Sequence, residues 1–196
     1  MAGELDPPLR VDWLDSGDLR DERPGRLGLT FLPGKHGASL RYPGRVYRRE
    51  LKTDLADLEA AGIRLLVLLV EDGELRRWGD PRIVEAAAAR GIAVVRCPIP
   101  DGSPPASLEQ MDGILATIAG ARNATSVAVA CMGGVGRTGV VAACALVAAG
   151  WRAADAIGRV RLVRHPEAVE TPAQEAFVRA YERHMAVRTA SGKVAP

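Results

Sequence analysis

The chain has 196 residues, enough for one domain with a sizeable core and short for two. Hydrophobic residues make up 47% and charged residues 26%, as in an ordinary globular domain, and no apolar run approaches the roughly 20 residues of a membrane span. The formal net charge of +2 gives no general basicity that would favour nucleic acid, so neither a nucleic acid nor a membrane partner is expected.

The two ends of the chain differ in composition from its middle. Residues 1–26 are polar and punctuated by Pro and Gly, and we interpret them as an N-terminal extension. Residues 188–196 are expected to form a flexible tail, which leaves 27–187 as the folded domain. The acidic start lacks the features of a secretory signal, and three cysteines are too few for a disulfide scaffold, so a cytoplasmic protein is expected.

Between these ends, strand-like apolar runs alternate with helical patterns. The run 65–70 is apolar without a break, which is typical of a strand buried on both faces. The expected strands, in chain order, are 27–32, 65–70, 92–95 and 126–130. The expected helices are 54–61, 81–90, 108–119, 140–149, 153–163 and 173–186. Such alternation predicts an α/β fold with a central, mostly parallel sheet of about four or five strands flanked by helices.

A glycine-rich loop follows the strand 126–130, and a helix follows the loop. The residues of the loop are Cys131, Met132, Gly133, Gly134, Val135, Gly136, Arg137 and Thr138. The glycines let the backbone curl so that several N–H groups converge on one point, and the helix N-terminus adds partial positive charge there. These groups favour the thiolate of Cys131, and Arg137 is able to grip two phosphoryl oxygens. Residues 132–137 therefore form a predicted phosphate cradle with Cys131 as nucleophile.

Three further residues complete the predicted chemistry. Asp101 follows a strand on a Pro/Gly loop at the same sheet edge, and it is the candidate general acid and then the base for water. Gln174 would position that water, and the Thr138 hydroxyl would stabilise the returning thiolate. Each has a simpler interpretation: Asp101 as a turn residue, Gln174 as part of a helix capping box begun by Thr171, and Thr138 as a helix cap.

At this point the residues resemble the protein tyrosine and dual-specificity phosphatases. The loop from Cys131 to Thr138 matches their Cys-x-x-x-x-x-Arg-Ser/Thr motif, and Asp101 stands where dual-specificity members carry their acid. The pattern over residues 27–181 looks most like the cyclin-dependent-kinase-associated phosphatase group. The resemblance implies hydrolysis of phosphotyrosine, and also of phosphoserine or phosphothreonine, in a phosphorylated protein substrate. It implies no metal and no cofactor, and no oligomeric state follows from it.

One residue departs from the family pattern. Ala130 precedes the cysteine, where the family has a histidine that lowers the thiol pKa. The departure predicts a less acidic Cys131 and a weaker enzyme. A weakly active or inactive phosphate-binding module is therefore an alternative function.

The glycine-rich loop also has a second interpretation. Residues 134–139 also read as Gly-x-Gly-x-x-Gly, the dinucleotide fingerprint, which requires a strand after the helix that ends in an acidic residue. The pattern of residues 151–163 is helical instead, which disfavours dinucleotide binding.

Cys97 and Cys144 are expected in the core, with a redox bridge from Cys97 to Cys131 as the less favoured option. Arginines cluster near residues 41–49 and 159–164, as solvated helix faces or as a positive rim for an anionic substrate.

Overall fold

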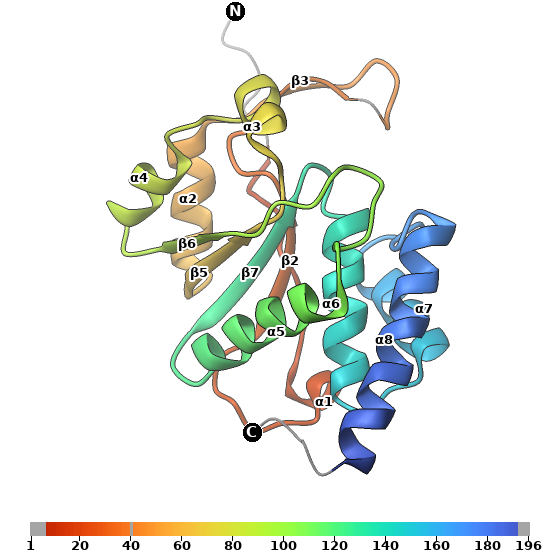
Figure 1. Cartoon of the computed structure of the whole chain (residues 1–196). Helices are drawn as coiled ribbons and strands as arrows, with labels where there is room; N and C mark the ends of the chain where they lie inside the picture. The colour runs from red at the N-terminus through yellow and green to blue at the C-terminus, as the bar shows by residue number, and fades with distance from the viewer. Residues whose placement is uncertain (1–6, 40, 192–196) are drawn as a thin grey trace, which may run out of the picture.

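A five-stranded sheet forms the centre of the molecule (Figure 1). The structure, a computed structural model, describes residues 7–39 and 41–191. The strands run in the order β1-β2-β7-β5-β6; β1 is antiparallel to β2, and all other neighbours are parallel. Their bounds are β1 (Asp12–Leu14), β2 (Leu27–Phe31), β5 (Ile63–Leu68), β6 (Ala93–Arg96) and β7 (Ser126–Cys131). The predicted mostly parallel α/β sheet is confirmed.

Helices cover both faces of this sheet (Figure 1). One face packs against a group made of α1 (Ser16–Leu19), α5 (Leu108–Arg122), α6 (Gly136–Ala148), α7 (Ala153–Val163) and α8 (Pro172–Ala190). The other face packs against α2 (Leu51–Ala60), α3 (Asp72–Trp78) and α4 (Ile83–Ala88). Within the described residues, no helix is long and apolar enough to cross a bilayer.

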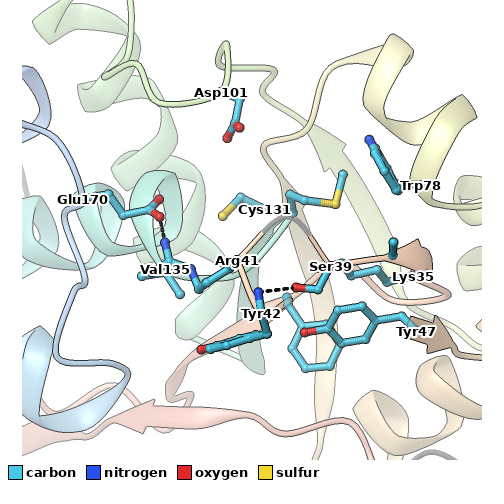
Figure 2. A pocket seen from close by; sticks show the side chains of 14 residues that line it. Lys35, Ser39, Arg41, Tyr42, Tyr47, Trp78, Asp101, Cys131, Val135 and Glu170 are labelled. Carbon is cyan, nitrogen blue, oxygen red and sulfur yellow. Dashed lines mark hydrogen bonds and ion pairs between the residues drawn. The ribbon is translucent and has the colours of Figure 1, made fainter. Parts of the chain in front are cut away.

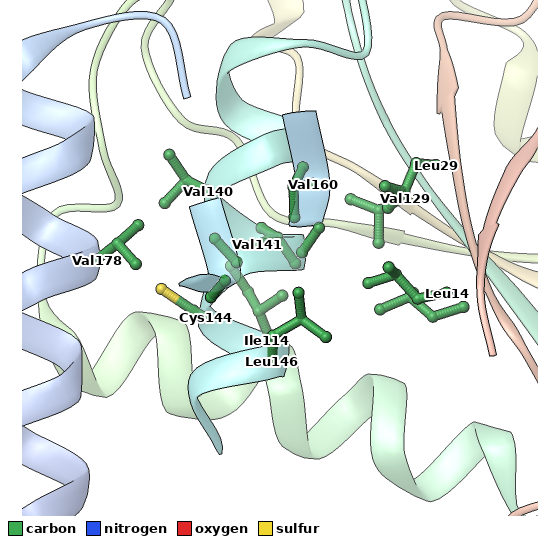
Figure 3. Packing of buried hydrophobic residues seen from close by; sticks show 14 of the residues in the cluster. Leu14, Leu29, Ile114, Val129, Val140, Val141, Cys144, Leu146, Val160 and Val178 are labelled. Carbon is green, nitrogen blue, oxygen red and sulfur yellow. The ribbon is translucent and has the colours of Figure 1, made fainter. Parts of the chain in front are cut away.

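Strand β5 shows why both faces must be covered. Leu65 and Val67 belong to one hydrophobic core, and Leu66 and Leu68 belong to the other. Successive side chains of a strand point to opposite faces, so an unbroken apolar run needs apolar cover on both sides. Helix α6 fills the larger core because almost its whole surface is buried; Figure 3 shows Val140, Val141 and Cys144 among side chains from the sheet and the neighbouring helices.

The N-terminal segment is part of the domain, and the prediction of an extension over residues 1–26 is wrong for the part that the structure describes. Strand β1 adds an antiparallel edge to the sheet, and Leu14 is fully buried against Leu29 and its neighbours (Figure 3). The alternation of Leu9, Val11 and Trp13 with charged residues is a half-buried strand pattern that Pro and Gly obscured. Residues 1–6 lie outside the described residues.

The predicted tail also begins too early. Helix α8 continues to Ala190, and Arg188 forms an ion pair with Asp112 of α5, so residues 188–190 belong to the fold. Residues 192–196 lie outside the described part of the chain.

Several element boundaries differ from the prediction. Helix α2 begins at Leu51 after Glu50, three residues before the predicted start, and α6 begins at Gly136. The short helices α1 and α3 were not predicted, and neither was a two-stranded hairpin of β3 (His36–Ala38) and β4 (Val46–Arg48). All of these elements are too short to show a clear hydrophobic period.

Candidate active site

The carboxyl ends of four parallel strands meet at one edge of the sheet, and each is followed by a residue of the site. Lys35 follows β2, Glu74 follows β5, Asp101 follows β6, and Cys131 is the last residue of β7. Ligands of parallel α/β sheets bind at such an edge. The topology therefore gathers residues that lie far apart in the sequence.

The loop after β7 needs glycine at residue 134. The backbone of Gly134 has a φ of +67°, which side-chain-bearing residues rarely adopt, and its N–H donates to Cys131 Sγ at 3.2 Å. A Cβ there would lie 2.4 Å from the carbonyl oxygen of Thr30. The loop is thus pressed against strand β2, and its backbone curls around the sulfur.

Helix α6 begins within this loop, at Gly136, with Val135 as its N-cap residue. The Val135 side chain makes no capping hydrogen bond, so the first amides of the helix are left available to other acceptors. A Cβ on Gly136 would lie 1.9 Å from a Glu170 carboxylate oxygen, so a larger residue at this position would displace the Glu170 side chain. The 13-residue helix directs its positive end toward the region of Cys131.

The Cys131 thiol combines burial with a net stabilisation of its anion. Burial raises the pKa of this thiol, but the charge of Arg137, the hydroxyl and N–H of Thr138, and the N–H of Gly134 lower it by more, so that the pKa lies below its usual value. Thr138 is fully buried, and within the described residues no other group competes with the Cys131 anion for its hydroxyl, which is otherwise without a hydrogen bond. The pKa of Cys131 is therefore below its usual value even though Ala130, and not a histidine, precedes the cysteine.

Arg137 is held from behind by a carboxylate that sequence reasoning missed. Its guanidinium donates to both oxygens of Glu74 at 2.7 Å and to the carbonyl of Ile99 at 2.9 Å. Burial raises the pKa of Glu74, and the hydrogen bonds from Arg137 and the Glu71 amide lower it by more. A sequence signal existed, because Glu71 and Glu74 form a capping box at the start of α3, directly after an apolar strand.

Asp101 lies over the loop, with its side chain toward Cys131 (Figure 2). Its carboxylate forms an ion pair with Arg137 at 2.8 Å, and 67% of the side chain is exposed. Asp101 thus lies at the same sheet edge as Cys131 and is paired with Arg137, and its role as general acid stays a prediction.

The loop that carries Asp101 is fastened to the start of α8. Thr171 Oγ1 donates to the carbonyl of Gly102 at 3.0 Å, and Gln174 Nε2 donates to the carbonyl of Ser103 at 3.2 Å. Gln174 is fully buried. Its side-chain Oε1 accepts from the backbone N–H of Glu170, and its backbone N–H donates to Thr171 Oγ1. These contacts favour a capping and loop-fixing role, and a water-positioning role of Gln174 stays a prediction.

A cavity of about 290 Å³ opens above Cys131 (Figure 2). The loop contributes Cys131, Met132, Gly133 and Val135 to its wall, and the β3–β4 hairpin and its flanks contribute most of the rest. The remaining lining residues are Phe31, Lys35, Ala38, Ser39, Arg41, Tyr42, Tyr47, Trp78, Asp101 and Glu170.

The hairpin is tied down on the far side of the cavity. Arg41 forms ion pairs with Glu167 and Glu170, and the Tyr42 hydroxyl lies 3.0 Å from the Nε2 atom of His165. Of the arginines that clustered in the sequence, Arg41 lines the cavity. Others are committed elsewhere, since Arg49, Arg159, Arg161 and Arg164 pair with Asp54, Asp18, Glu175 and Asp12.

The elements around the glycine loop disagree with dinucleotide binding. After β7 the described chain contains only α6, α7 and α8, so the loop is followed by no strand that would carry the acidic residue of a dinucleotide site. Cys97 and Cys144 both have free thiols, and burial raises the pKa of each.

Comparisons with known proteins agree with this geometry. Residues 43–151 match the model of a family described as polymorphic toxin system, DSP-PTPase phosphatase. Cyclin-dependent kinase inhibitor 3 of Rattus norvegicus is 27% identical over 194 residues, which cover 97% of this chain and 86% of that protein.

Two solved structures have the same fold. The kinase associated phosphatase, crystallised with its catalytic-site cysteine replaced by serine, superposes with a TM-score of 0.80 at 24% identity, covering 92% of this chain and 97% of that one. The active form of Tk-PTP superposes with a TM-score of 0.65 at 30% identity, covering 83% and 93%. The family match spans more than half of the chain and includes Asp101, Cys131 and Arg137. The chain therefore belongs to the DSP-PTPase phosphatases, and it is a protein-tyrosine/dual-specificity phosphatase near the kinase-associated group.

Proposed function

We propose that this protein hydrolyses phosphate esters of phosphorylated proteins through a cysteinyl-phosphate intermediate on Cys131. Phosphotyrosine is the expected substrate, with phosphoserine and phosphothreonine in addition. The observation that carries the proposal is the Cys131 thiol itself: its pKa is lowered, and it lies at the base of an amide-rich loop, beneath Asp101. The relative solved with its catalytic-site cysteine replaced by serine supports the same role for a cysteine.

The first step transfers the phosphoryl group to sulfur. The Cys131 thiolate attacks phosphorus, the bond from phosphorus to the ester oxygen breaks, and protonated Asp101 gives its proton to that oxygen. Loop amides and Arg137 stabilise the charge on the phosphoryl oxygens. Arg137 already holds a carboxylate oxygen of Asp101 at 2.8 Å, and phosphoryl oxygens would take that place and free Asp101 to act on the leaving group.

The second step returns the enzyme to its starting state. Asp101, now a carboxylate, takes a proton from water as the water oxygen attacks phosphorus. The phosphorus–sulfur bond breaks, inorganic phosphate forms, and the Thr138 hydroxyl stabilises the departing thiolate. Gln174 contributes by fixing the loop that carries Asp101.

Turnover of para-nitrophenyl phosphate and of phosphopeptides tests the proposal. We expect turnover by the natural chain, loss in Cys131→Ser, and retention in Cys97→Ser, because Cys97 is outside the cavity lining and its thiol pKa is raised. Acid quenching during turnover should trap phosphate on Cys131, and Asp101→Asn should slow the first step with natural leaving groups.

The inactive phosphate-binding module remains the second candidate, because Ala130 replaces the histidine of the family pattern. It predicts that phosphate or vanadate raises the melting temperature of the natural chain while no substrate is turned over. Unchanged turnover in Cys131→Ser would contradict the nucleophile assignment outright.

A further inference from the structure

Lys35 is a buried lysine whose ammonium group has no carboxylate partner among the described residues. Only 7% of the residue is exposed, and within the described residues no hydrogen bond or ion pair reaches its Nζ. The Nζ lies 4.1 Å from the centroid of the Tyr47 ring. Lysines are rarely buried without an ion-pair or hydrogen-bond partner, because removal of a charge from water costs free energy that such a partner normally offsets.

Lys35 and Cys131 line the same cavity, and Lys35 lies on the side opposite Arg41 and Glu170. Figure 2 shows Lys35, Tyr47 and Trp78 on one side of Cys131, with Arg41 and Glu170 on the other. Arg41 is already paired with Glu170 and Arg137 with Glu74. Among the described lining residues, Lys35 is therefore the cation without a carboxylate.

Lys35 carries its charge at neutral pH. Burial lowers its pKa, Arg45 and Arg41 lower it further, and the Cys131 thiolate raises it, with a resulting pKa of about 8. The cavity's two carboxylates, Asp101 and Glu170, are each held by an arginine. An anion that enters this side of the cavity would thus find an ammonium group with free donors.

We propose that Lys35 binds a carboxylate on the substrate, from an acidic side chain next to the phosphorylated residue, and so selects acidic phosphopeptides. This inference rests on the proposed function and names the substrate class. The phosphoryl group has its own partners in the loop amides and Arg137, so Lys35 serves a second anion. One ammonium matches the single charge of a carboxylate, whereas a second phosphate dianion would need another unpaired cation.

Two phosphotyrosine peptides test this assignment, identical except for Glu or Gln on both sides of phosphotyrosine. For the natural chain we expect the Glu peptide to have the higher kcat/KM by about tenfold, or ~1.4 kcal/mol. Lys35→Met and Lys35→Gln should bring this ratio close to one, and Lys35→Arg should preserve most of it. Lys52→Met is the matched control, because Lys52 is exposed on α2 and outside this cavity, and it should leave the ratio unchanged.

Two outcomes would overturn the proposal: a ratio near one for the natural chain, or a ratio that survives both Lys35→Met and Lys35→Gln. An equal loss of para-nitrophenyl phosphate and Glu-peptide turnover in these variants would also overturn it, since Lys35 would then serve the scissile phosphoryl group. If the natural chain turns over none of these compounds, the proposed function fails, and the ratio of the two peptides' dissociation constants, measured by calorimetry, tests Lys35 instead. Melting temperatures of all variants establish that each is folded.

Discussion

Two residues illustrate how this site acquires its chemistry from opposing effects. Burial by itself makes Cys131 a poorer acid, and only the positive groups gathered by the loop reverse that. Arg137 is buried to 2% exposure, and it is tolerated there because Glu74 and the Ile99 carbonyl satisfy it. Reactivity at this site therefore depends on the groups that contact Cys131 and Arg137 as much as on the nucleophile itself.

The lowered pKa of Cys131 predicts selective alkylation. At about pH 6, below the usual thiol pKa of about 8.5, iodoacetamide should modify Cys131 before Cys97 and Cys144. The sign follows from the thiolate being the reactive form, which persists to lower pH when the pKa is lowered and requires higher pH when burial raises it. Peptide mass mapping measures the order, inorganic phosphate should protect Cys131, and equal labelling of Cys97 and Cys131 would contradict the prediction.

Loss of the Glu74 carboxylate should impair Arg137. Glu74→Gln removes the ion pair that orients the guanidinium, so we expect kcat/KM for para-nitrophenyl phosphate to fall by at least about tenfold, or ~1.4 kcal/mol. Glu71→Gln is the control, since Glu71 caps α3 three residues earlier and is not among the partners of Arg137 in the described part of the chain. Equal activity of the two variants would show that Glu74 does not position Arg137.

At the scale of elements, helix termini hold the loops of the site. Thr171 caps α8 and also binds the carbonyl of Gly102, so one hydroxyl links a helix to the loop that carries Asp101. The hairpin is secured in a similar way, by Arg41 and Tyr42, against the segment between α7 and α8. The C-terminal helices thus support two sides of the cavity.

A cap that also supports the loop should affect activity as well as stability. Thr171→Val should lower the free energy of unfolding by about 1 kcal/mol, as for other N-cap losses, and should also lower kcat because the Asp101 loop is released. Ser107→Ala removes the N-cap of α5, which has no such link, so it should cost similar stability without the loss of kcat. Urea denaturation and steady-state kinetics on both variants distinguish the two effects, and equal kcat values would count against the link.

At the scale of the whole molecule, the N-terminal strand β1 supports the active-site loop through strand β2. Strand β1 covers the edge of β2, and β2 in turn supports the glycine loop through the close approach of Thr30 and Gly134. Thr30 Oγ1 also donates to the carbonyl of Arg10 at 2.8 Å. The segment before β2 therefore belongs to the framework beneath the nucleophile.

Truncation of a side chain in that segment should destabilise the whole domain. Leu14→Ala should lower the free energy of unfolding by about 3 kcal/mol, within the range for a fully buried leucine. Leu162→Ala should change it by less than about 0.5 kcal/mol, because Leu162 is 83% exposed. Comparison of urea midpoints measures both, and a small effect of Leu14→Ala would restore the interpretation of an N-terminal extension.

The sequence alone determined the features that depend on near neighbours. Strand β7, the glycine loop and α6 are consecutive, so Cys131 and Arg137 could be placed together from glycine spacing and hydrophobic pattern, and the long apolar runs predicted the parallel sheet. Tertiary structure decided the partners that come from distant segments. Glu74 reaches Arg137 across 63 residues, Lys35 enters the cavity from the loop after β2, and β1 joins the sheet, because the strand order brings these segments to one edge. Such contacts follow from the path of the whole chain, and no local period in the sequence encodes them.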